Sequence, residues 1–206
     1  MNDLQQLIDS RSRVFESTTL TELTAWRLGG RLQELLDSLE SPKLTSLTLG
    51  YCLRNEQARA IASSPYLANL KKLELWSEIG GDGAEAIAGS PHLSKLTKLK
   101  LSPSNLGSRG AQAIARSPHL ANLTILDLED SGIGNQGARA IARSPQLANL
   151  TELNLNLNGI GAMGAEELAA SPYLLLPAKL SALRSARFDA IADQVERGSQ
   201  SRYTGR

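Results

Sequence analysis

The sequence contains few aromatic residues, histidines and cysteines. Of its 206 residues only 4% are aromatic, and there are two histidines and a single cysteine, Cys52. An interior built on aromatic packing is therefore excluded, and Leu, Ile and Ala must form the core. Because one cysteine cannot form a disulfide within the chain, a reducing compartment is the simpler interpretation.

Neither sign of charge is in excess. The chain has 22 Lys and Arg against 21 Asp and Glu, a net charge of +1, whereas nucleic-acid binders usually have a strong basic excess. It has no run of about 18 apolar residues, and residues 1–10 are polar, unlike a secretory signal. We therefore predict no nucleic-acid partner, no membrane span and a cytoplasmic protein, with signal-less export as an effector left open.

The sequence does have an internal repeat, and overlooking such a repeat would misassign the fold. The pair Ser-Pro returns at intervals of 26 or 27 residues, with its proline at Pro65, Pro91, Pro118, Pro145 and Pro172. A Gly-Ala-x-Ala-Ile-Ala stretch precedes most of these pairs, as at residues 110–115 and 137–142. The pattern L-x-x-L-x-L starts at Leu44, Leu70, Leu96, Leu123 and Leu150.

The two parts of each repeat have different periods. The last two leucines of the pattern are two residues apart, so they lie on one side of a strand. In the alanine-rich stretch, Ala111, Ile114 and Ala115 form one stripe of a helix, and the following proline ends that helix. Each repeat is predicted to be a strand, a loop, a short helix and a return loop. Stacked copies bury the apolar sides that one copy exposes.

This repeat resembles the leucine-rich repeats of the ribonuclease-inhibitor type, and its Ser-Pro-x-Leu ending resembles bacterial versions of them. The signature L-x-x-L-x-L-x-x-(N/C) is complete at Cys52 and Asn158, whereas the repeats between have Glu78, Ser104 and Ser131 at the last position. The resemblance implies an α/β fold, a horseshoe-shaped solenoid with a parallel β-sheet on its concave face and short helices on its convex face. It also implies that ligands bind on the concave face.

The chain is expected to divide into an array and two caps. Residues 18–174 form about six repeats, of which the first is degenerate. Residues 1–17 are predicted to form a largely helical N-terminal cap and residues 175–197 a C-terminal cap helix, because an open solenoid end exposes core. The polar residues 198–206 are predicted to be disordered.

The repeat spacing identifies the side chains that would line a concave face, which are the non-leucine strand positions and the residues just after each strand. Aromatic residues come first along the chain, lysines next and acids last. We predict partner binding through Tyr51, Lys72, Glu74, Trp76, Lys98, Lys100, Asp127, Glu129, Asp130, Glu152 and Asn154. Trp76 either forms a binding hot spot or covers its own sheet. The acids either meet a basic partner or form a solvated face.

No arrangement of residues predicts catalysis, a cofactor or a metal site. There is no Gly-rich phosphate loop, and no Ser-His-Asp arrangement has its usual context. His92 and His119 share a position in successive repeats, but two ligands without a third make a poor metal site. Arginines gather on the predicted convex side, at Arg109, Arg116, Arg139 and Arg143. They are either soluble surface or contacts to an acidic partner or a phosphate.

The sequence therefore predicts a protein–protein interaction scaffold, not an enzyme, that offers a preformed curved surface to another protein. The alternative is a regulator, an inhibitor or activator, of a partner enzyme such as a nuclease or a small GTPase, because the resemblance allows both roles. End-to-end self-association is a further hypothesis. Well-capped ends argue against it, so we expect a monomer.

Overall fold

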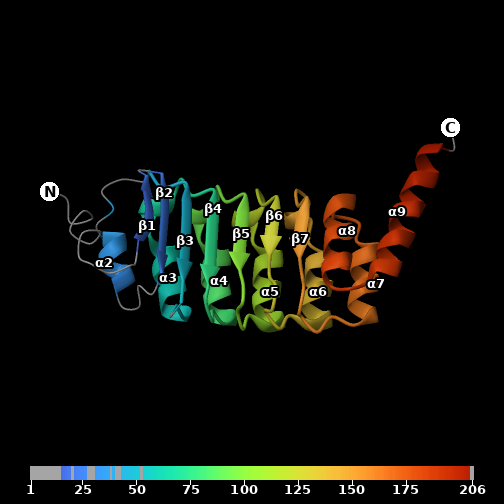
Figure 1. The fold of residues 1–206 in the computed structure, drawn as a ribbon, viewed down its shortest axis with the longest axis horizontal. Coiled ribbons are helices and arrows are strands. Elements are labelled where there is room, and N and C mark those ends of the chain that lie inside the picture. The colour runs from blue at the N-terminus through green and yellow to red at the C-terminus, as the bar shows by residue number, and fades with distance from the viewer. Residues whose placement is uncertain are drawn as a thin grey trace.

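The computed structural model describes residues 15–19, 21–26, 31–37, 39, 43–51 and 53–204 of the chain. Its strands form one seven-stranded sheet and follow each other in chain order from β1 to β7. β1 pairs with β2 in antiparallel orientation, and all pairs from β2 to β7 are parallel. Helices cover one side of this sheet in the same order, so the described chain is an α/β solenoid (Figure 1).

Strands and helices alternate along the array. The strands are β1 (Phe15–Thr19), β2 (Glu22–Trp26), β3 (Ser46–Gly50), β4 (Lys72–Trp76), β5 (Lys98–Leu101), β6 (Ile125–Asp127) and β7 (Glu152–Asn154). The helices are α2 (Leu32–Asp37), α3 (Asn55–Ser63), α4 (Gly81–Gly89), α5 (Gly107–Arg116), α6 (Gly134–Ala142), α7 (Ala162–Ala170), α8 (Leu176–Ser185) and α9 (Asp189–Thr204). Short 3-10 turns begin at the Ser-Pro prolines, at Pro65–Leu67, Pro91–Leu93, Pro118–Leu120 and Pro145–Leu147.

The repeated leucines align from strand to strand and form the core. Leu47 pairs with Leu73, and Leu73 with Leu99, in the parallel register. These leucines are buried, as are Ala111 and Ile114 on the helical stripe. Sheet and helices enclose one continuous aliphatic core. This confirms the predicted strand and helix periods, because both apolar patterns face the same interior.

Glycine allows the helices of neighbouring repeats to lie close together. A Cβ atom on Gly137 of α6 would lie 2.6 Å from Ile133 Cβ in its own chain segment and 3.0 Å from Ala111 Cβ in α5. The same close approach occurs at Gly83, Gly110 and Gly164. No larger side chain fits there without a shift of the helices. The glycine of each Gly-Ala pair therefore sets the spacing between helices.

The serines of four Ser-Pro pairs join their repeats to the preceding helix. The Ser117 hydroxyl donates a hydrogen bond to the backbone carbonyl of Ala88 in the last turn of α4. The same bond joins Ser90 to Ala62, Ser144 to Ala115 and Ser171 to Ala142. Carbonyls in a last helical turn have no N–H partner within the helix. In these pairs the proline ends one helix, and the serine provides a hydrogen-bond donor to a carbonyl at the end of the previous helix.

A second row of polar side chains holds the loops after the strands. Asn158 Oδ1 accepts a hydrogen bond from the N–H of Ser131 at 3.1 Å. In the β4 repeat this position belongs to Ser77, whose Oγ accepts from the Leu53 N–H at 2.7 Å and donates to the Leu53 carbonyl at 2.8 Å. The assignment of Glu78 to this row is wrong. The β4 repeat is one residue shorter between its strand and this position, and Glu78 is exposed.

At the N-terminal end, β2 continues the parallel sheet and α2 continues the helical layer. Leu23 of β2 pairs with Leu47 of β3, and three leucines of α2 are buried. β1 then adds the antiparallel strand at this end of the sheet. Residues 1–14, which hold most of the predicted N-terminal cap, lie outside the described residues, as does Cys52.

The C-terminal end is covered by two helices, where the sequence predicts one. α8 ends at Ser185, Arg187 two residues later has a φ of 66°, and the N–H of Phe188 bonds the carbonyl of Leu183 at 2.8 Å. This is a Schellman-type helix end with arginine where glycine is usual, so no glycine marks the break. α9 then extends to Thr204, through most of the segment predicted to be disordered, and projects from the array (Figure 1). Its first turns are anchored by the buried Ala192, and the polar turns simply continue the helix.

α8 also covers the last edge of the sheet. Ser181 Oγ accepts a hydrogen bond from the N–H of Leu153 and donates one to the carbonyl of the same residue, both at 2.8 Å. Ser185 Oγ accepts from the N–H of Leu155 at 2.9 Å. These hydroxyls take the place of the backbone groups that a further strand would supply. The edge of β7 is thereby protected from pairing with another chain.

Candidate binding face

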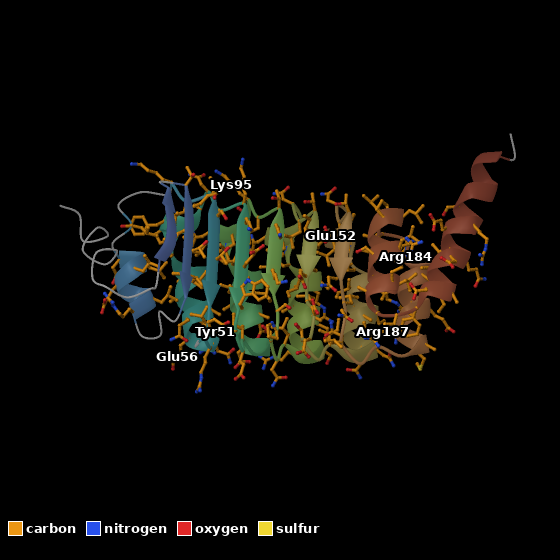
Figure 2. The ribbon with its side chains drawn as sticks, in the orientation of Figure 1. Tyr51, Glu56, Lys95, Glu152, Arg184 and Arg187 are labelled. Atoms are coloured by element: carbon orange, nitrogen blue, oxygen red, sulfur yellow. The ribbon has the colours of Figure 1, made fainter. Side chains whose placement is uncertain are left out.

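The residues predicted to bind a partner lie on the open face of the sheet, opposite the helices, and on the loops after the strands. They are Lys72, Glu74 and Trp76 on β4, Lys98 and Lys100 on β5, Asp127 on β6, Glu152 and Asn154 on β7, Tyr51 after β3, and Glu129 and Asp130 after β6. Figure 2 shows Tyr51 at the carboxyl ends of the strands and Glu152 near the amino end of β7. Parallel register places equivalent residues in rows that cross several repeats.

Glu74 is buried on this face and is held by two lysines. Its Oε1 lies 3.3 Å from Lys72 Nζ and 2.9 Å from Lys98 Nζ. Burial raises the pKa of Glu74, but the hydrogen bond from Lys98 and the charges of both lysines outweigh burial and lower the pKa below its ordinary value. Glu74 is therefore ionised at neutral pH and compensates the charge of the lysines around it.

Trp76, Lys100 and Asp127 form a chain of contacts over three neighbouring strands. Lys100 Nζ lies 4.2 Å from the centroid of the Trp76 ring and 2.6 Å from Asp127 Oδ2. The side chains of Lys100 and Asp127 are 14% and 15% exposed, whereas Trp76 is 38% exposed. The ion pair fixes the ammonium group, and the cation–π attraction fixes the ring against it. Trp76 is thus held in place while part of it stays open to solvent.

Two asparagines hold the acidic side chains at β6. Asn154 Nδ2 donates hydrogen bonds to Asp127 Oδ1 and Glu129 Oε2, both at 3.1 Å. Asn156 Nδ2 donates to Glu129 Oε1 at 3.1 Å. Asp127 Oδ1 also accepts from the backbone N–H of Glu129 at 3.0 Å. Side chains from β5 to the loop after β7 therefore form one connected network that includes Lys100.

The charges are arranged differently from the zones that the sequence predicts. All three lysines of the face pair with carboxylates on their own or a neighbouring strand, so they form no separate positive zone. Glu152 does not lie in the row of Asp127, because the parallel register sets it beside Ile125. Chain order alone misses this pairing, since contacts between strands bring opposite charges together.

A groove of about 660 Å³ opens beside Trp76 at the carboxyl ends of the strands. It is lined by Tyr51, Leu53, Arg54, Trp76, Ser77, Glu78 and Pro103. Its walls are largely apolar and aromatic, with one cation and one carboxylate. The sequence predicted only the two aromatic residues of this lining as binding residues. The others belong to loops between strand and helix, whose conformation no periodic pattern fixes.

Two bulky residues at this end of the strands have a left-handed backbone. Tyr51 has a φ of 59° and is 58% exposed, and Leu157 has a φ of 56° and is 59% exposed. Asp130 occupies the equivalent position after β6 with a φ of 49°. Hydrogen bonds to the next repeat hold this turn, as from the Tyr51 N–H to the Trp76 carbonyl at 2.9 Å. A left-handed backbone costs an L-residue about 1–2 kcal/mol, so both side chains are presented to solvent under strain.

In the part of the chain that the structure describes, no three His, Cys, Asp or Glu side chains come together in an arrangement that would hold a metal ion. His92 and His119 are half-buried in successive 3-10 turns. Among the helices of the described ranges, none combines the length and the apolar character needed to cross a membrane.

Comparison with known proteins agrees with this architecture. The family described as Leucine Rich repeat matches residues 92–115, 119–142 and 146–169. The human leucine-rich repeat-containing protein 14 is 53% identical over 49 residues, which are 23% of this chain and 10% of that protein. The match thus spans a small part of the human relative. With the leucine register and the alternating strands and helices, these matches show that residues 92–169 are leucine-rich repeats within an α/β solenoid.

Proposed function

We propose that this protein is a scaffold that binds another protein across the open face of its sheet. The single observation that carries the proposal is the partly exposed Trp76 held by Lys100 and Asp127. Tryptophan is enriched at the centres of protein interfaces, and a ring that is already fixed loses little freedom on binding. Leucine-rich repeats generally mediate protein–protein interaction, which favours a non-enzymatic scaffold.

The strained turn after the strands supports the same face. Tyr51 and Leu157 each place a large apolar side chain in solvent from a backbone conformation that glycine would adopt without strain. Strained residues of this kind gather at functional sites, where the surrounding structure holds them in place. Tyr51 also lines the groove beside Trp76. Contact with a partner would bury both aromatic side chains together.

The charge of the face indicates what the partner contributes. The predicted binding residues include three lysines and five acids, which leaves two negative charges uncompensated. Asp130 and Glu152 are exposed, whereas the lysines are paired within the face. We therefore propose that the partner inserts an apolar side chain into the groove beside Trp76 and places cationic side chains over the acids. Association would then slow as salt is added.

Affinity capture from a lysate of the source cells, followed by titration of each captured protein, tests this proposal. The variants are Trp76→Ala and the control Tyr66→Ala, which removes an exposed aromatic side chain from a 3-10 turn outside the face. We expect Trp76→Ala to weaken binding by about tenfold or more. The control should bind like the wild type.

Circular dichroism of every variant separates loss of the site from loss of the fold. A folded Trp76→Ala variant that binds as tightly as the wild type would contradict the proposed face. Equal weakening by Tyr66→Ala would contradict it as well, because that side chain lies elsewhere on the molecule.

A further inference from the structure

The helical side of the solenoid has a basic strip between two acidic ones. Helices α5 and α6 contain arginine but neither Asp nor Glu. The helices on either side are acidic, with Asp82 and Glu85 on α4 and Glu166 and Glu167 on α7. Arg109, at the α4 side of the strip, pairs with both α4 acids, at 2.7 Å and 2.6 Å. The centre of the strip lies between α5 and α6, away from the two α4 acids.

An open hollow of about 610 Å³ lies between α5 and α6. The long polar side chains that line it are Gln112, Arg116, Gln136, Arg139, Arg143 and Gln146. None of its lining residues is acidic. Three guanidinium groups and three carboxamides from two helices and the following turn therefore face one space, and all six groups can donate hydrogen bonds.

The ion pairs around the hollow leave it positive. Glu167 of α7 lies 3.0 Å from Arg143 Nη2 and 3.4 Å from Arg139 Nε, and it does not line the hollow. Arg116 has no acidic group within ion-pair distance among the described residues. One carboxylate thus serves two arginines, and each guanidinium has five N–H groups, of which Glu167 occupies only a few. Net positive charge and free donors remain for a ligand.

The neighbouring hollow between α3 and α4 shows that this arrangement is not a general property of the repeat. It has a similar volume of about 570 Å³ but contains a single arginine, Arg59. That arginine lies 3.6 Å from Asp82, and the positions equivalent to Arg116 and Arg143 are Ser63 and Gly89. The repeat therefore tolerates a hollow with a single arginine, paired with an acid, at this place. The concentration of arginine between α5 and α6 is specific to that pair of helices.

We propose that the hollow between α5 and α6 binds a phosphoryl group, carried by a phosphorylated protein side chain or by a small phosphate compound. A carboxylate has two oxygens and one charge. Arg143 alone donates hydrogen bonds to both oxygens of Glu167, each at 3.0 Å. A phosphoryl group brings nearly two charges and three acceptor oxygens, which matches several guanidiniums arriving from two helices. This site is independent of the open face of the sheet.

Calorimetric titration of the full chain at low ionic strength tests the site. One arm uses inorganic pyrophosphate, and the other uses a short peptide with one phosphoserine, with the same peptide carrying Ser or Glu as controls. We expect saturable binding of at least one phosphorylated probe. Binding of pyrophosphate alone would identify a small phosphate compound as the ligand, and preference for the phosphopeptide would identify a phosphorylated protein.

Three variants locate the binding. Arg116→Gln should weaken it about tenfold, the effect of losing one charged hydrogen-bonding group. Gln136→Glu, an exposed substitution that adds a negative charge to the lining, should weaken it as well. Arg109→Gln is the matched control, because it removes an arginine from the same side outside the hollow and should leave binding unchanged.

Three results would overturn the proposal. They are the absence of saturable binding with both phosphorylated probes, equal binding of the Glu peptide, and equal weakening by Arg109→Gln. The last result would show attraction to overall charge instead of a site. Circular dichroism checks that each variant is folded, and the two hollow variants change different side chains, so an unfolded variant does not leave the hollow untested.

Discussion

At the scale of single residues, the open face of the sheet depends on side chains that reach one strand away. Glu74 bonds lysines on its own and the following strand, and Lys100 connects Trp76 to Asp127. Each contact joins neighbouring repeats or two residues of one strand. A substitution on this face therefore alters the contacts between repeats as well as the surface that a partner meets.

Replacing Glu74 by Gln should lower the free energy of unfolding by about 1 kcal/mol at pH 7, because the two lysines then contact a neutral amide instead of a carboxylate. The folded protein lowers the pKa of Glu74, so the unfolded chain binds the proton more readily. The stability from the ionised carboxylate is then complete above the ordinary carboxyl range and is lost as pH falls through the folded pKa. Urea unfolding of wild type and variant, from pH 7 into the acid range, checks this.

The difference in unfolding free energy between wild type and Glu74→Gln should shrink as the solution becomes acidic. A difference that stays constant with pH would mean that the carboxylate charge contributes nothing. Lys95→Gln, at an exposed lysine that bonds Asn69 and lies away from Glu74, is the control and should show little pH dependence of its own.

At the scale of elements, helix spacing depends on glycine and helix ends depend on serine. Replacing Gly137 by Ala should lower the free energy of unfolding by about 2 kcal/mol, because the new Cβ meets Ile133 and Ala111. Gly89→Ala is the matched control at the end of α4, where no atom lies within 4 Å of the added Cβ. There alanine should be neutral or stabilising by up to about 1 kcal/mol. Urea unfolding of both variants measures the difference, and equal effects would contradict the packing argument.

The strands and helices of the array were predictable because burial imposes a period on each of them. Leucines two residues apart and the stripe of Ala111 and Ile114 both face one core, so the sequence pattern and the fold coincide. The loops follow no such period. Because the β4 repeat is one residue shorter, Ser77 and not Glu78 forms the hydrogen bonds that hold the loop. The end of α8 was not predicted because Arg187 has the left-handed backbone conformation that glycine usually adopts after a helix.

The open face of the sheet was predictable as a set of positions but not as an arrangement of charges. The strand spacing placed Trp76 and Lys100 on the open face, and the structure has both there. Which acid pairs with which lysine depends on strand register and on side-chain length. The order of residues along one strand predicts neither the register nor the partner. The groove beside Trp76 is formed by loops of different repeats, so no local sequence pattern predicts it.

At the scale of the whole molecule, we propose that the protein is a monomer whose sheet is closed at its last strand by α8. Replacing both Ser181 and Ser185 by Ala should cost about 1 kcal/mol for each lost hydrogen bond and leave backbone groups of β7 without partners. Such an edge pairs with other chains, so the double variant should form larger species in light scattering. Ser199→Ala, whose hydroxyl bonds only within α9, is the control and should stay monomeric.

The two serines of α8 hydrogen-bond the backbone of Leu153 in β7 and of Leu155 just after it, so these bonds do not depend on the side chains of the last repeat. The helix also presents the small Ala178 and Ala182 to the core, a surface that suits any row of leucines. Array length is therefore a modular property of this chain. If a further repeat of 27 residues were inserted ahead of α8, the backbone of its strand would bond the same two serine hydroxyls. The array would then lengthen by one repeat and keep its present C-terminal cap.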